Sequence, residues 1–153
     1  MSISYEPALS LIKKYEGLRL KVYKCPAGLD TIGYGHVILD TEKDLYKGIT
    51  VKQADELLSA DIKRFAIGVI KLVKVPVTDN MINALVSFSF NVGLGSLKTS
   101  TLLKKVNNRK FEEASNEFLK WNKAKVKGKL TVLIGLDRRR KEERELFLRG
   151  YNA

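Results

Sequence analysis

The segment from residue 79 to residue 92 constrains the fold of this chain more than any other. Its sequence, DNMINALVSFSFNV, follows Thr78, a residue type that caps helices, and precedes Gly93. Apolar side chains surround the helix that this segment predicts, at Met81, Ile82, Ala84, Leu85, Val86, Phe88, Phe90 and Val92. A helix that is apolar on every side has to be covered by other elements. We therefore expect it to form the centre of a helical bundle.

Other segments supply the helices that cover this centre. Apolar residues recur at helical spacing in residues 5–16, 50–73, 97–106, 111–121 and 137–150. The second of these is about six turns long at roughly 3.6 residues per turn. We expect that long helix to join two lobes of the molecule.

Two polar residue types mark helix starts in these segments. Thr50 is followed three residues later by Gln53, which is the spacing of a capping box. Asp137 is placed to cap the last helix, which we expect to end near Gly150. Residues 123–129, just before that helix, are basic and contain a glycine, which favours a loop, and the apolar run 131–134 after them is ambiguous.

The region from residue 18 to residue 47 has the pattern of a small sheet. Apolar and polar residues alternate from Leu18 to Tyr23, which is typical of a half-buried strand. Residues 25–28, Cys-Pro-Ala-Gly, form a turn, and residues 31–35 favour a second strand. The fold class is therefore α+β: one domain, with a β lobe at about 17–49 and a helical lobe of about 1–16 and 50–153.

Composition excludes several classes of protein. The single cysteine rules out an internal disulfide framework, and one cysteine with one histidine makes no convincing zinc site. No organic or metal cofactor is implied. The N-terminal segment is too short and amphipathic for a signal peptide or membrane anchor, so we expect synthesis in the cytoplasm.

The formal net charge of +11 predicts an anionic partner. Nucleic acid is one candidate, although no motif of a nucleic-acid-binding fold accompanies the charge. The bacterial envelope, with its acidic polymers and phosphorylated lipids, is another. Charge alone does not choose between them.

Glu16 is the first candidate catalytic residue. It lies on the apolar face of the first predicted helix, in the last turn before Gly17. Desolvation at such a position raises the pKa of a carboxyl group, and a protonated carboxyl can act as a general acid. The alternative is a glutamate at a frayed helix end, exposed to solvent. Cys25 and Thr31, on the predicted hairpin that follows, are placed to converge with Glu16 on one cleft.

The run from Glu16 to His36 resembles the active-site segment of the phage-type lysozymes, or endolysins. In that family a Glu is followed after eight residues by Asp or Cys and after five more by Thr, and this chain has Glu16, Cys25 and Thr31 at those spacings, followed by TIGYGH. The segments NALVSFSFNVG, LKTSTLL and GLDRRRKEE are also similar to the family, so the resemblance covers essentially the whole chain.

The resemblance implies roles for several residues. It makes Glu16 the general acid, has Cys25 act as a base to water or as a nucleophile, and has Thr31 position the water. It implies a structural role for His36, paired with a carboxylate for which Asp61 is the best match. It also implies an arginine partner for Glu16, with Arg138 the closest match and Arg139 or Arg140 as alternatives.

The implied activity is hydrolysis of the β-1,4 bond between N-acetylmuramic acid and N-acetylglucosamine in peptidoglycan, by a monomer, leading to host cell lysis. Substrate contacts are expected at Gly35, Val37, Phe90 and Asn91. Without an export signal, release to the wall requires a separate membrane pore. A rival or additional activity is disruption of anionic membranes by the basic C-terminal helix. A specific nucleic-acid partner is not expected.

Overall fold

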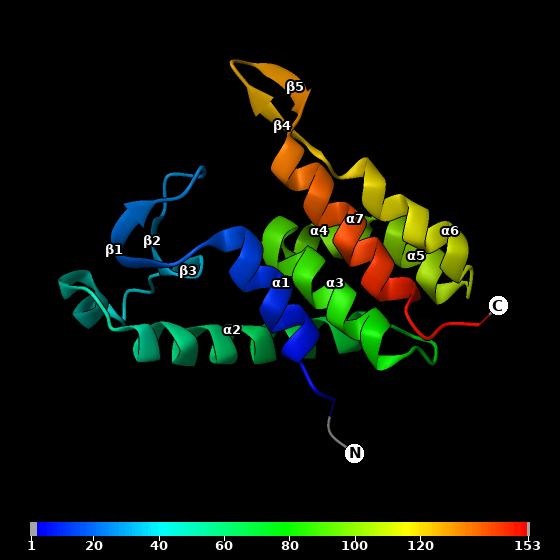
Figure 1. The fold of residues 1–153 in the computed structure, drawn as a ribbon, viewed down its shortest axis with the longest axis horizontal. Helices are drawn as coiled ribbons and strands as arrows, with labels where there is room; N and C mark the ends of the chain where they lie inside the picture. The colour runs from blue at the N-terminus through cyan, green and yellow to red at the C-terminus, as the bar shows by residue number, and fades with distance from the viewer. Residues whose placement is uncertain (1–2, 153) are drawn as a thin grey trace.

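The computed structural model describes residues 3–152, and its elements are shown in Figure 1. The helices are α1 (Glu6–Glu16), α2 (Val51–Leu72), α3 (Asp79–Val92), α4 (Leu94–Thr99), α5 (Thr101–Asn107), α6 (Phe111–Glu117) and α7 (Ile134–Leu148). The strands are β1 (Arg19–Lys24), β2 (Asp30–Gly33), β3 (His36–Val37), β4 (Lys123–Val126) and β5 (Lys129–Val132). Two short 3-10 helices are η1 (Lys43–Lys47) and η2 (Phe118–Lys120). The fold is α+β, as predicted.

Helix α3 is the centre of the helical part, as its apolar sequence predicts. All residues from Met81 to Ser89 are buried, and α3 packs against α1, α2 and α7 (Figure 1). The hydroxyl of Thr78 accepts a hydrogen bond from the backbone N–H of Met81 at 3.1 Å, which confirms the predicted cap. Because α3 is fixed on all sides, the helices around it are held in defined positions.

Helix α2 connects the sheet to the bundle, also as predicted (Figure 1). Its capping box is present: the backbone N–H of Thr50 donates to Gln53 at 2.8 Å, and that of Gln53 donates to the Thr50 hydroxyl at 3.1 Å. The first turn of α2 contributes Ala54 to a small core with Ile32 and Ile49 under the sheet. The rest of α2 packs into the large core of the bundle.

The sheet has three antiparallel strands in the order β1-β2-β3. Thr31 on the central strand lies opposite Tyr23 on one side and Val37 on the other. The prediction of a half-buried first strand is wrong for most of its length, because β1 is an edge strand with little packed against it. Leu18 and Leu20 remain 38% and 39% exposed, and only Val22 packs toward the small core.

The region predicted as a loop before the last helix is a β-hairpin. Strands β4 and β5 pair in register from Lys123 with Val132 to Val126 with Lys129. The turn residues Lys127 and Gly128 both have positive φ values, 50° and 79°, as two-residue hairpin turns require. The hairpin projects from the bundle at the start of α7 (Figure 1).

Two helix boundaries also differ from the prediction. The segment 97–106 contains two helices, because the hydroxyl of Ser100 accepts from the N–H of Leu103 at 3.0 Å and starts α5 there. The last helix begins at Ile134, so Asp137 lies in its first turn and does not cap it.

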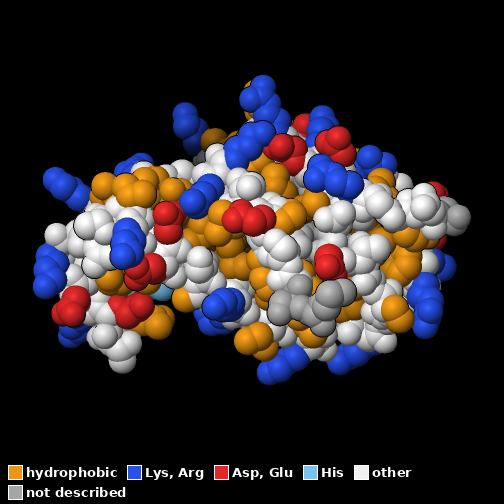
Figure 2. Space-filling model, turned by 60° about the horizontal axis from the view of Figure 1, so that its bottom comes forward, with side chains coloured by type: hydrophobic (Ala, Val, Ile, Leu, Met, Phe, Trp, Pro, Cys, Tyr) orange, Lys and Arg blue, Asp and Glu red, His pale blue; other side chains and the backbone are white. Residues whose placement is uncertain are grey.

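Lysine and arginine side chains are spread over both lobes, as Figure 2 shows for one face of the molecule. Among residues 3–152, no helix combines the length and the apolar character needed to cross a membrane.

Candidate active site

Glu16 is the last residue of α1, and its side chain lies against the sheet lobe at Gly35. The helix stops at Gly17, whose φ of 71° is unfavourable for other residues and whose N–H donates to Lys13 at 3.3 Å. The Glu16 side chain is 21% exposed. A carboxyl group at this place is accessible to a ligand and shielded from most of the solvent.

Gly35, between β2 and β3, lies directly against Glu16. A Cβ atom at Gly35 would be 2.9 Å from Oε1 of Glu16 and 3.5 Å from the ring of Phe90. Its φ of 74° is also in the left-handed region. Gly35 and Phe90, both predicted as substrate contacts, are therefore brought to the carboxyl group of Glu16.

Cys25 and Thr31 lie together at the other end of the β1–β2 hairpin. The N–H of Cys25 donates to the carbonyl of Leu29 at 3.0 Å, and the Thr31 hydroxyl donates to the same carbonyl at 2.9 Å. Cys25 is half-buried and Thr31 is 2% exposed. The pKa of the Cys25 thiol is lowered, mainly by hydrogen bonding to the backbone of Leu29, with a smaller contribution from the Thr31 hydroxyl. A lowered thiol pKa increases the fraction present as thiolate, which is the nucleophilic and basic form.

Tyr23 connects the two parts of the site and was not predicted. It lies opposite Thr31 in the sheet. Its pKa is raised by burial first and then by the negative charges of Glu16 and Cys25. The sequence signal for Tyr23 is only its position in the alternating strand.

The arginine partner of Glu16 is Arg139, one of the two alternatives considered. Its Nη1 lies 2.7 Å from Oε2 of Glu16, and its side chain is 3% exposed. The closest match expected from the sequence, Arg138, is exposed and does not take this place. The two residues differ by about 100° around the helix, so the rotation of α7 against α1 and α3 decides which one faces Glu16.

A buried cluster behind Arg139 was not predicted either. Glu143 is fully buried, and its Oε2 accepts hydrogen bonds from Arg139 at 3.2 Å and from the Ser87 hydroxyl at 2.6 Å. Arg140, also fully buried, lies 3.2 Å from Oε1 of Glu143 and donates to the side chain of Asn91. The pKa of Arg140 is lowered to about 10, chiefly because burial penalises its charge. The spacing of Glu143, three and four residues after two arginines, was the available sequence signal.

His36 is paired with Asp61, as predicted. Its Nδ1 lies 2.7 Å from Asp61, and its Nε2 lies 2.9 Å from Glu42, a second carboxylate that was not predicted. The pKa of His36 is raised, mainly by the hydrogen bond with Asp61 and with burial acting in the opposite direction. His36 therefore ties the β3 segment to α2 and lies in a structural position.

The two remaining predicted contacts lie on opposite lobes. Val37 is 39% exposed on β3, next to Thr31 in the sheet. Asn91 is exposed near the end of α3, and its side-chain oxygen is occupied by Arg140. Among the described residues, neither side chain forms a hydrogen bond or ion pair with Glu16 or Cys25, so their role in binding stays a prediction.

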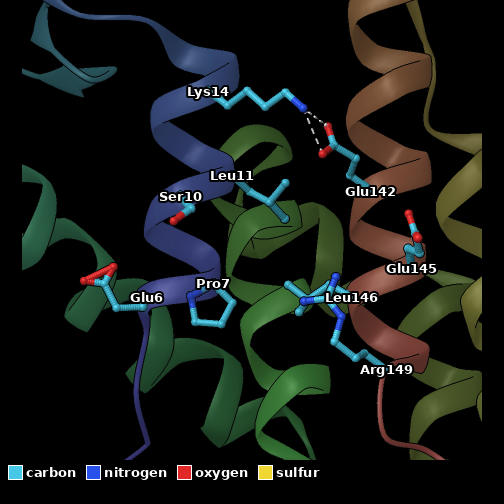
Figure 3. Close-up of a pocket in the computed structure, with 9 residues that line it drawn as sticks. All are labelled: Glu6, Pro7, Ser10, Leu11, Lys14, Glu142, Glu145, Leu146 and Arg149. Carbon is cyan, nitrogen blue, oxygen red and sulfur yellow. Dashed lines mark hydrogen bonds and ion pairs between the residues drawn. The ribbon is translucent and has the colours of Figure 1, made fainter.

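A separate hollow of about 370 Å³ lies between α1 and α7. Leu11 and Leu146 give it an apolar part, and Lys14 bridges it to Glu142 at 2.9 Å (Figure 3). None of the predicted site residues lines it. Among the described residues, no group of three or more His, Cys, Asp or Glu side chains is arranged to hold a metal ion.

Comparisons with known proteins agree with this fold and identify the family. The family model described as phage lysozyme matches residues 13–143. An endolysin of Acyrthosiphon pisum secondary endosymbiont phage 1 is 48% identical over 93% of this chain and 95% of its own length. An endolysin of Bacillus phage B103 is also 48% identical, over 98% of this chain, but the match spans only 55% of that longer protein.

Solved structures have the same fold. The muramidase domain of SpmX from Asticaccaulis excentricus is 38% identical, with a TM-score of 0.84 over 96% of this chain and 97% of that one. Sequence, fold and site thus point the same way: the chain belongs to the phage lysozyme family and is a glycoside hydrolase of the lysozyme type.

Proposed function

We propose that this protein is an endolysin-type muramidase that cleaves the β-1,4 bond between N-acetylmuramic acid and N-acetylglucosamine in peptidoglycan. The observation that carries the proposal is the position of Glu16. Its carboxyl group is held by Arg139 at 2.7 Å and lies against Gly35, which follows the strand that carries Thr31. The relatives named endolysins and the structural neighbour named a muramidase domain support the same substrate class.

Glu16 is assigned as the general acid. Its proton passes to the glycosidic oxygen as the bond to the anomeric carbon breaks, and the leaving sugar departs as an alcohol. The Gly35 backbone supports this assignment, because its missing side chain leaves room for the Glu16 carboxyl group itself to lie against the sheet lobe. Arg139 orients the carboxyl group without touching the substrate.

Cys25 is assigned to the attack on the anomeric carbon. As a nucleophile, its thiolate forms a glycosyl–sulfur bond that water then hydrolyses; as a base, it takes a proton from the attacking water. Both routes stay open. Thr31 supports a water in either case, because its hydroxyl donates to Leu29 and keeps its oxygen free to accept from water.

The test is Glu16→Gln, which keeps the shape of the side chain and removes the acid. We expect clearing of purified walls to fall by about 10²–10⁴-fold, the usual range for loss of general acid catalysis. Glu6→Gln is the matched control, since Glu6 is exposed at the other end of the same helix. Clearing by Glu16→Gln within a factor of about three of the parent would show that the assignment is wrong. New reducing ends on muramic acid identify the bond that is cut.

Membrane disruption by α7 is the second candidate function. Arg139, Arg140, Glu143, Leu146 and Phe147 of this helix are buried. The apolar residues on the buried face of the helix can therefore insert into a membrane only if the helix leaves the bundle. Leakage of anionic vesicles caused by Glu16→Gln protein, absent with neutral vesicles and weakened by salt, would support this activity.

The muramidase proposal also includes synthesis in the host cytoplasm and passage to the wall through a separate pore.

A further inference from the structure

Four charged side chains, Glu16 of α1 and three residues of α7, form one connected set of ion pairs. Glu16 and Glu143 are the acidic members, and both contact Arg139, at 2.7 Å and 3.2 Å. Arg140 completes the set at 3.2 Å from Glu143. The pKa of the Glu143 carboxyl is raised, chiefly by burial, with Arg140, Arg139 and the Ser87 hydroxyl acting in the opposite direction, and the formal charges of the set balance when Glu143 is ionised.

Glu143 occupies the middle of this set. It has no exposed surface, and each oxygen faces an arginine. The Ser87 hydroxyl adds a hydrogen bond to it from α3, and Arg139 also donates to the carbonyl of Ser87 at 3.0 Å. The guanidinium of Arg139 is thus held from three directions, by Glu16, Glu143 and α3.

We infer that Glu143 is a positioning residue for the active site, which shares Arg139 with Glu16 and fixes Arg140 against Asn91. Because Glu143 pairs with the same arginine, its negative charge offsets part of the positive charge that Arg139 presents to Glu16. The ionised form of Glu16 is therefore stabilised less by Arg139. Glu143 thereby helps to set the field that Arg139 exerts on the Glu16 carboxyl, and removing either charge changes that field. The inference rests on the proposed function in one respect only: the effect on Glu16 matters for catalysis because Glu16 is the proposed proton donor.

The groups that face these carboxylates are known for the described residues. Arg139 and Arg140 of α7 face Glu143, and α3 presents the uncharged Ser87 to it. Arg139, Arg140 and Tyr23 of β1 face Glu16. Removing the negative charge of Glu143 therefore makes the electrostatic potential at Glu16 more positive. Removing the positive charge of Arg140 makes it more negative.

The experiment measures the titration midpoint of the Glu16 carboxyl by ¹³C NMR on protein labelled at glutamate, with the signal assigned by its loss in Glu16→Gln. Glu143→Gln leaves two arginines facing Glu16, so we expect the midpoint to fall by at least about half a pH unit. Arg140→Gln removes a positive charge, and the midpoint should rise. In the double variant the two changes should largely cancel.

Glu145→Gln is the matched control. Glu145 is exposed on the same helix, and its loss should leave the Glu16 midpoint unchanged. Thermal melts identify variants that fail to fold. If Glu143→Gln is one of them, Arg140→Gln and the double variant carry the test.

A measurement on the unaltered protein does not depend on any variant folding. The Glu143 carboxyl signal should shift at the pH where Glu16 titrates, because the two groups share one arginine. A flat Glu143 signal through that titration, or folded variants without opposite shifts, would overturn the inference. These results do not involve hydrolysis, so they are distinguishable from a failure of the proposed function, which the wall-clearing assay of Glu16→Gln reports.

Discussion

Arg139 lies 2.7 Å from Glu16, although 123 residues separate them in the chain. The contact joins the end of α1 to the first half of α7, two neighbouring helices that both pack on the buried helix α3. Arg139 is almost completely buried and Glu16 is partly exposed, so the arginine acts as a fixed support for a group that meets the ligand. Each feature of this arrangement can be tested by substitution.

Arg139 should be necessary where Arg138 is not. Arg139→Lys keeps a positive charge but loses the planar fork that contacts Glu16, Glu143 and Ser87 together. We expect wall-clearing activity to fall by about 10–100-fold, as misplacement of a catalytic group commonly causes. Arg138→Lys, at an exposed position, should retain parent activity. Equal effects of the two substitutions would contradict the assignment of Arg139.

Gly35→Ala should damage the site with little damage elsewhere. The new Cβ would meet Glu16 Oε1 at 2.9 Å, and the backbone φ of 74° is unfavourable for alanine. We expect lower activity and a destabilisation of about 1–3 kcal/mol, read from wall clearing and thermal melts. Gly95→Ala is the control, because nothing lies within 4 Å of its Cβ position in α4. Parent-like activity in Gly35→Ala would show that Glu16 has more room than the structure indicates.

The His36 cluster should give stability a defined pH dependence. The pKa of His36 is raised above 6.5, so its contribution to the free energy of unfolding is complete below about pH 6.5 and is lost as pH rises through the folded value. The pKa of Glu42 is lowered below 4.5: burial opposes this shift, but hydrogen bonds from Leu39 and His36 outweigh it. The contribution of Glu42 is complete above about pH 4.5 and is lost as pH falls through its folded value.

Urea unfolding of the parent and His36→Gln checks this dependence. The parent should exceed the variant by more at about pH 5.5 than at about pH 9, because only the lower pH keeps His36 protonated between its two carboxylates. A difference that is the same at both pH values would mean that protonation of His36 does not contribute.

We expect aspartate, but not alanine, to replace Cys25 with retention of wall-clearing activity. Cys25→Asp should stay active, because a carboxylate there can act as base or nucleophile. Cys25→Ala should lose about 10²-fold or more in wall clearing. Alkylation should inactivate the parent faster as pH rises through a thiol pKa that lies below 9.0, and a bound wall fragment should slow it.

A packing role for Cys25 predicts the opposite order of the two variants. Alanine would then be nearly harmless, and a buried aspartate would destabilise the protein. Thermal melts alongside the activity assay separate these outcomes. A fully folded and fully active Cys25→Ala would leave Glu16 and Thr31 without this partner.

The sequence by itself determined the features that depend on nearby residues. Capping of α2 by Thr50 and of α3 by Thr78 follows from hydrogen bonds within one turn, so the residue types and spacings predict it. The central place of α3 follows from its apolar surface, which no other arrangement would bury. Glu16 ends the first helix, and Cys25 and Thr31 lie on the hairpin directly after it, so their positions depend on residues that are close in the chain.

Tertiary structure decided what depends on elements distant in the chain. The sequence offers three consecutive arginines, and only the rotation of α7 against α1 and α3 directs Arg139 to Glu16 and Arg140 to Asn91. The burial of Glu143 has the same origin, because a glutamate on an otherwise charged helix carries no local signal of its surroundings. Local patterns report which face of a helix is apolar, and the distance between two polar side chains on different helices is set only when those helices pack.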